Sequence, residues 1–244
     1  RWQRSQTEKG SENRTKNRTE KTLLSAGSDN TIKIWTGQRS ANKLWTGEAQ
    51  LVKSVVSHQR GVHSVDWSPT GEFFAAASAD HSVRIWTAKG EAVRALTGHT
   101  DAVWQVSYSP DGNQLASVSS DRTLRLWTPQ GTLLKTWTGH TDTIRHVSYS
   151  PDGQHLITAS EDNTLRLWHH QKGLTQTITD PSGGVWCARF SPDGHFIASG
   201  GADGVIRLWS VNRQSASSPI SSRHAVSIAP NPLMLQGHRG WIRS

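Results

Sequence analysis

The stretch from Gly98 to Trp127 reads GHTDAVWQVSYSPDGNQLASVSSDRTLRLW, and residues 139–168 repeat it as GHTDTIRHVSYSPDGQHLITASEDNTLRLW. Tryptophan keeps the same interval of 41 residues over most of the chain. These tryptophans are Trp45, Trp86, Trp127, Trp168 and Trp209. A repeat of about 40 to 45 residues is typical of a four-stranded unit that packs against its own copies. Within the unit, residues 114–119 and 123–127 are short, alternating and bounded by turn residues, which predicts β-strands.

Each full unit contains a Gly-His or Ser-His pair, a Ser-Pro-x-Gly turn, a run ending in Asp and a closing Trp. This combination resembles the WD40 repeat, and the resemblance extends over residues 22–244. The family usually has Asp after the closing Trp, whereas this chain has residues such as Thr87 and Thr128 there. That position follows the strand, so the change bears little on the fold. The resemblance implies an all-β fold, a WD40-type β-propeller of which about five blades are represented.

Two kinds of segment differ from the repeats. Residues 1–21 are polar and without a period, which predicts a disordered basic tail. Within the predicted propeller, residues 22–244, we expect loop insertions at 36–45 and at 210–232. The second of these is rich in Ser, Pro and Asn, which favours a surface loop.

The two ends of the repeat region leave two architectures open. Residues 22–35 form the second half of a blade, and residues 237–244 begin another repeat. These parts either combine to close a five-bladed ring, which would remove free sheet edges, or belong to a longer propeller. Seven blades are usual in the family that the repeats resemble. The missing initial Met and the stop within a repeat favour the fragment.

The composition restricts the partners and the location. The formal net charge is +8, and no basic stripe occurs inside the repeats, so nucleic acid is an unfavoured partner. Cys187 is the only cysteine, which fits a reducing compartment, and no signal peptide is visible, so we expect a cytoplasmic protein. No apolar run approaches the ~18 residues of a membrane span. No phosphate-binding loop of known spacing is present, and no cofactor is predicted.

A His, a Ser or Thr, an Asp and a Trp recur at fixed spacing in the repeats. The resemblance implies a structural tetrad, in which His bonds to Asp and Ser, and Ser accepts a bond from the Trp N–H. A buried Trp N–H and an imidazole both need partners, which supports such a network. Recurrence in several blades argues against a catalytic triad, so we expect no catalytic residue and no enzyme. The tetrad residues are His58, Asp80 and Trp86; His99, Ser117, Asp121 and Trp127; and His140, Thr158, Asp162 and Trp168.

Two departures from this pattern carry expectations of their own. Ala76 stands where the first full repeat should have Ser or Thr. In the fourth repeat Pro181 stands where His belongs, so Asp203 is predicted to lack its partner and to matter less for stability. His169 and His170 are adjacent on a strand, so we expect their side chains to diverge and predict no metal site.

Apolar residues at Val103, Val106 and Tyr108 leave a step of three, which indicates a β-bulge near the start of each repeat. The resemblance implies that the side chains at this position belong to a ring of partner contacts on the top face, around the central channel. Trp and Arg are the residue types that dominate binding hot spots. The predicted contact residues at this position are His63, Trp104, Arg145, Trp186 and Arg243. The resemblance adds Thr143 and Trp241 two residues earlier in the repeat, and Glu161 before the turn Asp.

The sequence therefore predicts a non-catalytic scaffold that binds a protein or peptide of unknown identity on the top face. Trp104 and Trp186 beside Arg145 could hold a cationic side chain by cation–π contact, or a carboxylate through the guanidinium. Two alternatives remain open. One is the C-terminal sensor or regulatory module of a larger signalling enzyme, and the other is a propeller that binds nucleic acid through the basic tail.

Overall fold

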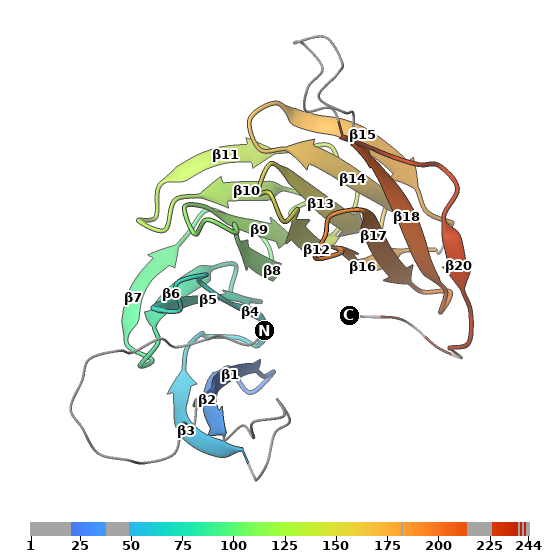
Figure 1. Ribbon diagram of the computed structural model, residues 1–244. Helices are drawn as coiled ribbons and strands as arrows, with labels where there is room; N and C mark the ends of the chain where they lie inside the picture. Colours follow the sequence, from blue (N-terminus) through green and yellow to red (C-terminus); the bar gives the residue numbers. More distant parts are fainter. Residues whose placement is uncertain are drawn as a thin grey trace, which may run out of the picture.

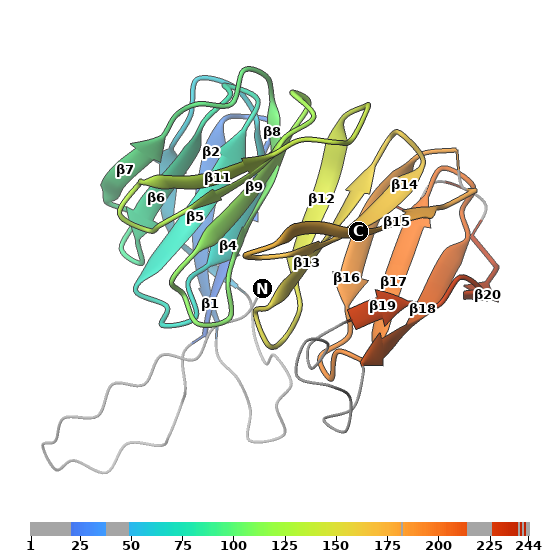
Figure 2. The same ribbon diagram turned by 90° about the horizontal axis from the view of Figure 1, so that it is seen from above.

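The computed structural model describes residues 21–37, 49–181, 183–213, 226–238, 240 and 242. Five antiparallel sheets stand side by side around an arc, and the described residues contain no helix (Figure 1). In the full sheets the first strand lies on the inner side of the arc and the last strand on the outer side (Figure 1). Figure 2 shows the same sheets from above, one blade after another. The arrangement confirms the all-β prediction and is that of a partial β-propeller.

The strands of each sheet follow one another in chain order. The first sheet contains β1 (Lys21–Ala26), β2 (Thr31–Gly37) and β3 (Gln50–Val56). The second contains β4 (Val62–Trp67), β5 (Phe73–Ser78), β6 (Val83–Thr87) and β7 (Ala92–Leu96). The third contains β8 (Val103–Tyr108), β9 (Leu115–Ser119), β10 (Leu124–Trp127) and β11 (Leu133–Trp137). The fourth contains β12 (Ile144–Tyr149), β13 (His155–Ser160), β14 (Thr164–His169) and β15 (Gly173–Thr179). The fifth contains β16 (Val185–Phe190), β17 (Phe196–Gly201) and β18 (Ile206–Arg213), and β18 also pairs with β19 (Val226–Ile228) and β20 (Leu233–Leu235).

A turn of one kind joins the first two strands of each later sheet. In the third sheet Gly112 N donates to Ser109 O at 2.9 Å, and Gly112 has a φ of 75°. This left-handed conformation costs glycine little, and Pro110 presets the preceding backbone angle. The turns at 68–71, 150–153 and 191–194 contain the same hydrogen bond. The repeated Ser-Pro-x-Gly sequence thus fixes where each inner hairpin reverses.

The core lies between neighbouring sheets. Ala77 of β5 packs in one cluster with Val106 and Leu115 of the third sheet, whereas its neighbour Ala76 packs with Ile34 of the first sheet. Successive strand residues point to opposite faces, so each sheet contributes to the cores on both of its sides. Each blade therefore depends on the adjacent blades to bury its apolar faces.

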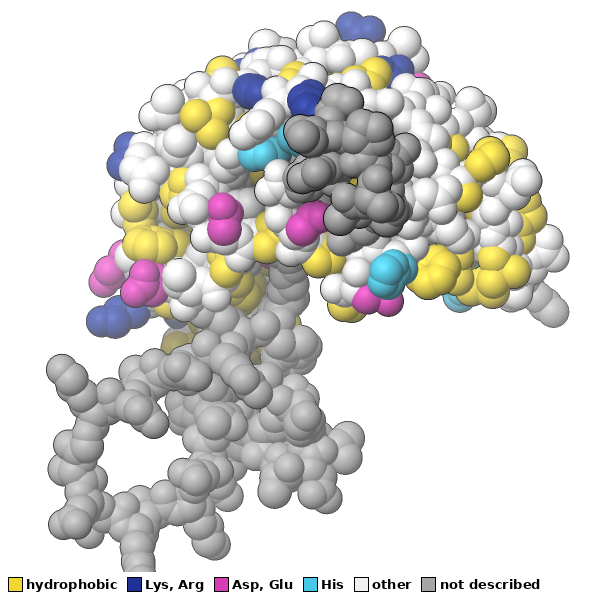
Figure 3. Space-filling model, turned by 45° about the horizontal axis from the view of Figure 1, so that its top comes forward, with side chains coloured by type: hydrophobic (Ala, Val, Ile, Leu, Met, Phe, Trp, Pro, Cys, Tyr) yellow, Lys and Arg dark blue, Asp and Glu magenta, His cyan; other side chains and the backbone are white. Residues whose placement is uncertain are grey.

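The outer strands are less covered. Val93 of β7, Leu133 and Leu134 of β11 and Leu174 of β15 are each between 43% and 45% exposed. In the space-filling view, apolar side chains lie in separate patches with charged side chains between them (Figure 3). The inner strands are more deeply buried, and their first residues line the channel side of the arc.

The arc is open between the sheet β1–β3 and the sheet β16–β20 (Figure 1). Among the described residues β1 pairs with β2 alone, so none of them adds a further strand beside β1 in the first sheet. Ile242 N instead donates to Gly201 O of the fifth sheet at 3.0 Å. Val62 N makes the equivalent bond to Gly27 O, also at 3.0 Å, where the second sheet follows the first. The closed five-bladed ring is therefore not the arrangement of the described residues.

Both predicted loop insertions overlap strands. Residues 36 and 37 belong to β2, and the rest of the first insertion up to 45 lies outside the described residues. In the second, β18 continues to residue 213 and pairs with β19, so 210–232 is not a loop throughout. Val211 and Ile228 are buried in the core of the fifth sheet, which explains why these parts of the insertion form strands. Of the predicted tail, Lys21 begins β1, and residues 1–20 lie outside the described residues.

Candidate functional site

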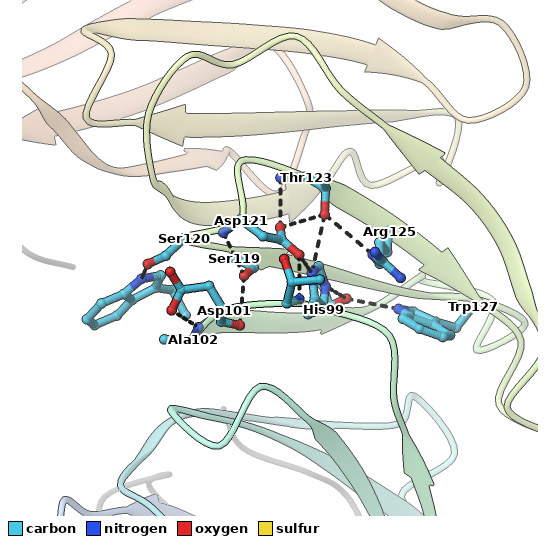
Figure 4. Close-up of polar contacts among 12 residues, drawn as sticks. His99, Asp101, Ala102, Ser119, Ser120, Asp121, Thr123, Arg125 and Trp127 are labelled. Carbon is cyan, nitrogen blue, oxygen red and sulfur yellow. Dashed lines mark hydrogen bonds and ion pairs between the residues drawn. The ribbon is translucent and has the colours of Figure 1, made fainter.

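The third sheet contains a complete chain of buried hydrogen bonds (Figure 4). Trp127 Nε1 donates to Ser117 Oγ at 2.9 Å, and Ser117 Oγ lies 2.7 Å from His99 Nε2. His99 Nδ1 lies 2.8 Å from Asp121 Oδ2. With the imidazole neutral and its proton on Nδ1, the Ser117 hydroxyl donates to Nε2 and Nδ1 donates to the carboxylate. Every polar side-chain group in this series of hydrogen bonds then has a partner.

The fourth sheet repeats this network with threonine in place of serine. Trp168 Nε1 donates to Thr158 Oγ1 at 2.9 Å, and Thr158 Oγ1 lies 2.7 Å from His140 Nε2. His140 Nδ1 lies 2.7 Å from Asp162 Oδ2. Thr158 and Ser117 are both fully buried, so neither hydroxyl can reach a substrate. The arrangement is that of a structural network.

Burial and pairing shift the pKa values in these networks. Burial lowers the pKa of His99 and of His140, although the adjacent carboxylates act to raise it. Burial acts to raise the pKa of Asp121, but hydrogen bonds from His99 and Thr123 hold that pKa far below its usual value. The folded protein therefore keeps a neutral imidazole beside an ionised carboxylate at neutral pH.

The second sheet has only part of the network. His58 Nδ1 lies 2.9 Å from Asp80 Oδ2, but Ala76 offers no hydroxyl. Within the part of the chain that the structure describes, the buried His58 Nε2 and Trp86 Nε1 have no hydrogen-bond partner. Burial acts to raise the pKa of Asp80, but hydrogen bonds from Ser82 and Gln59 lower it to about 2. Half of the network is thus retained without the residue that joins its two ends.

In the fifth sheet, the N–H of the closing tryptophan is linked to a different set of hydrogen-bond partners. Trp209 Nε1 donates to Ser199 Oγ at 2.9 Å, and Ser199 Oγ donates to Asp180 Oδ2 at 2.9 Å. Arg207 lies between two carboxylates, with Nη1 3.4 Å from Asp180 Oδ1 and Nη2 2.5 Å from Asp203 Oδ2. Asp180 is fully buried and Arg207 is 3% exposed. Asp180 and Arg207 together replace the imidazole, so the expectation that Asp203 lacks a partner is wrong.

On the inner strands, a β-bulge occurs at the position that the sequence indicates. The register shifts between Val103 and Gln105 on β8, which leaves Trp104 as the extra residue. The same shift on β4, β12 and β16 isolates His63, Arg145 and Trp186. A bulge turns its side chain away from the regular alternation of the strand. These four side chains, which we call the bulge residues, line one pocket on the channel side of the arc.

Three bulge residues form a continuous stack. The rings of His63 and Trp104 are parallel within 7°, and their centroids are 4.1 Å apart. Arg145 Cζ lies 3.7 Å from the centroid of the Trp104 ring. His63 comes from β4 and Arg145 from β12, the inner strands on either side of β8 (Figure 1). The indole is therefore flanked by one group from each neighbouring blade.

Hydrogen bonds hold the stack in place. Trp104 Nε1 donates to Ser120 Oγ at 2.7 Å. Arg145 Nε and Nη2 donate to Glu161 Oε1 at 2.9 and 2.6 Å. Burial lowers the pKa of His63, and the nearby Arg145 lowers it further, so the imidazole is neutral at neutral pH. The stack thus presents preorganised side chains, and Arg145 already has a carboxylate partner.

The pocket around the stack has a volume of about 630 Å³. The size is that of a cleft for a few side chains or a small ligand. The remaining predicted contact residues differ in position. Glu161 holds Arg145, and Thr143 O accepts a bond from Glu161 N at 3.0 Å without lining the pocket. Trp241 and Arg243 lie outside the described residues.

The structure adds residues to the pocket that the sequence did not suggest. Gln105 of β8 and Arg189 of β16 line it from the inner strands, one and three residues after a bulge residue. Arg189 is exposed and also lines the continuation of the channel beyond the pocket. It occupies the position that holds Asp66 in the second sheet and Ser107 in the third. A charged residue at a position that is otherwise variable and polar is the sequence signal that could have marked it.

The remaining features concern metal binding, the pair of adjacent histidines and membrane spans. Among the described residues no cluster of three His, Cys, Asp or Glu side chains is suited to a metal ion. His169 and His170 do not diverge, because their rings stack at 5.2 Å between centroids. No helix that could cross a membrane occurs in the described ranges.

The family model for the WD domain, G-beta repeat, known as WD40, matches the chain five times. The matches cover residues 16–36, 49–87, 90–128, 131–169 and 172–210, well over half of the chain. The chain therefore belongs to the WD40 repeat family. The first match begins inside the segment that composition assigns to the tail. A comparison with curated proteins found no match. WD40 repeats generally mediate protein–protein interactions, and WD40 domains are typically non-catalytic.

Proposed function

We propose that this chain is a non-catalytic scaffold that binds a protein or peptide at the pocket lined by the bulge residues. The stack of His63, Trp104 and Arg145 is the observation that supports this proposal. Aromatic and arginine side chains dominate the energetics of protein interfaces, and preorganised side chains lose little entropy on binding. Trp104, a half-buried tryptophan held by a hydrogen bond to Ser120, meets both conditions.

The different burial of two groups of polar residues in the repeat supports a scaffold over an enzyme. The Ser, His and Asp side chains that could resemble a catalytic set are buried and serve the closing tryptophans. Two polar side chains that line the pocket, Gln105 and Arg189, are instead half-buried and exposed, respectively. The partner is a polypeptide in this proposal because the pocket is open, mixed in character and lined by side chains from four blades.

A displayed library of random nine-residue peptides tests the proposal. We expect wild-type protein to enrich peptides whose Kd rises by a factor of about 30 in Trp104→Ala, the equivalent of about 2 kcal/mol at a hot spot. Trp137→Ala is the matched control, because Trp137 is also half-buried but lies on the outer strand β11. Peptides that bind Trp104→Ala and wild type equally well would place the binding site elsewhere.

A further inference from the structure

We infer that the pocket selects an acidic side chain of an extended peptide, and that the guanidinium of Arg189 receives the carboxylate. This inference rests on the proposed function, because it assumes that a peptide occupies the pocket. The sequence alone leaves open whether the pocket prefers a cationic side chain or a carboxylate, and the inference chooses the carboxylate.

The stack excludes a cationic side chain from Trp104. Arg145 already lies over the indole at 3.7 Å, in the position that a partner's Lys or Arg would take. His63 is stacked on the ring from the neighbouring blade at 4.1 Å. A partner cation would have to displace one of these groups and break the bonds from Arg145 to Glu161.

The charges around the pocket favour an anion. None of the described residues that line it is acidic, and two arginines do line it. Arg145 is neutralised by Glu161, with Nη2 2.6 Å from Oε1. Arg189 is exposed and has no hydrogen-bond or salt-bridge partner in the described part of the chain. It is the cation that is free to bind a carboxylate, which its planar guanidinium can do with two hydrogen bonds.

One carboxylate of the channel wall, that of Asp66, already accepts a hydrogen bond. Asp66 and Arg189 both line the narrow part of the channel next to the pocket. Asp66 is 5% exposed, and its Oδ2 accepts a hydrogen bond from Tyr108 N at 2.8 Å. Asp66 thus has a backbone hydrogen-bond donor of its own on the channel wall.

The surroundings of Arg189 favour a peptide over a phosphate backbone. Trp104 and Trp186 bring two half-buried aromatic rings to the same pocket, so an acidic residue is expected next to apolar ones. Nucleic-acid binding depends on many cations that contact successive phosphates. Here one unpaired arginine faces a pocket of about 630 Å³.

The test uses three displayed libraries of nine-residue peptides with random flanks and with Glu, Gln or Lys fixed at the fifth position. We expect the full chain to enrich the Glu library over the other two. For single selected peptides we expect Arg189→Gln to raise the Kd of the Glu peptide at least about tenfold, a typical effect of losing a charged hydrogen-bonded partner. The Gln form of the same peptide should bind both proteins alike, and Arg189→Glu should shift enrichment to the Lys library. Arg94→Gln, an exposed arginine on the outer strand β7, is the matched control.

The outcomes separate this inference from the proposed function. Peptides that depend on Trp104 but show no preference for Glu would overturn the inference and leave the binding face in place. Failure to enrich any peptide that depends on Trp104 would overturn both. A random single-stranded oligonucleotide that displaces the Glu peptide in an Arg189-dependent way would overturn the choice of a peptide partner.

Discussion

The third and fifth sheets use different residues to provide hydrogen-bond partners around the buried N–H of the closing tryptophan. In both, a buried tryptophan N–H donates to a serine at 2.9 Å. In the third sheet the serine leads to a neutral imidazole, whereas in the fifth it leads to the carboxylate of Asp180 and the guanidinium of Arg207. The comparison shows that the repeat conserves a buried hydrogen-bond chain within this molecule, and that the chemical nature of its middle member can change. The second sheet shows the consequence when the serine itself is absent.

The largest expected loss of stability comes from the network of Asp180 and Arg207 in the fifth sheet. Asp180→Ala removes one carboxylate from a buried guanidinium and leaves Ser199 without its acceptor. We expect a loss of about 3 kcal/mol in the free energy of unfolding, the low end for a broken buried ion pair because Asp203 still contacts Arg207. Chemical denaturation of both proteins measures it. A loss of less than about 1 kcal/mol, as for an exposed pair, would show that the pair does not bear on stability.

A substitution in the His99 network of the third sheet should cost less stability. Asp121→Ala leaves His99 Nδ1, at a partly buried position, and the exposed backbone N–H of Thr100 without their acceptor. We expect a loss of about 2 kcal/mol, within the usual cost of unsatisfied buried groups. Thermal and chemical unfolding of Asp121→Ala and Asp180→Ala in parallel would rank the two networks. The reverse order would mean that the charged network is the weaker one.

Acid should distinguish the networks further. Because burial lowers the pKa of His58, His99 and His140, the unfolded chain binds more protons than the folded one as the pH falls below about 6.5. Stability is therefore present above that pH and is lost on acidification, by at most about 1.4 kcal/mol per pH unit for each histidine. The lowered pKa values of Asp80, Asp121 and Asp162 extend the loss below about pH 4. Unfolding free energies between pH 7.5 and 4.5 should fall, and His99→Gln should reduce the slope. A flat profile would contradict the neutral imidazoles.

The smallest expected effect is a gain. Ala76→Ser would place a hydroxyl between His58 Nε2 and Trp86 Nε1, which both lack a partner within the described structure. We expect the free energy of unfolding to rise by about 1 kcal/mol, the net value of a buried hydrogen bond. Ala77→Ser is the control, because Ala77 is equally buried but packs in the core on the opposite side of the sheet. Equal effects of the two substitutions would show that the network position is not special.

Regular spacing explains what could be predicted from the sequence. The positions of His99, Ser117, Asp121 and Trp127 repeat 41 residues later, so the fold and the members of the network could be proposed together. The step from Val103 to Val106 was enough to indicate the bulge, because a bulge inserts one residue into the alternation. Trp35 closes the first sheet, with Nε1 2.8 Å from Ser25 Oγ. The in-phase Trp45 lies outside the described residues.

Interactions between non-equivalent positions could not be predicted in this way. Asp180 precedes the position of the missing histidine by one residue, so a comparison by spacing found only Pro181. Burial of Ile228 depends on Gln176 of the preceding blade, whose amide bonds both its N and its O at 2.8 and 3.0 Å. The partner of Arg145 and the free state of Arg189 likewise depend on which side chains meet across the channel. These contacts are set by tertiary packing and leave no period in the sequence.

The most direct measurement of the central claim follows the tryptophan indole N–H signals by NMR while the selected Glu peptide is added. Trp104 and Trp186 line the proposed binding pocket, whereas Trp127, Trp168 and Trp209 belong to the buried networks. Single Trp→Phe variants assign the signals. We predict that the Trp104 and Trp186 signals shift with peptide concentration while the three network signals stay in place. Shifts confined to the network tryptophans, or a bound peptide that moves neither Trp104 nor Trp186, would contradict the account.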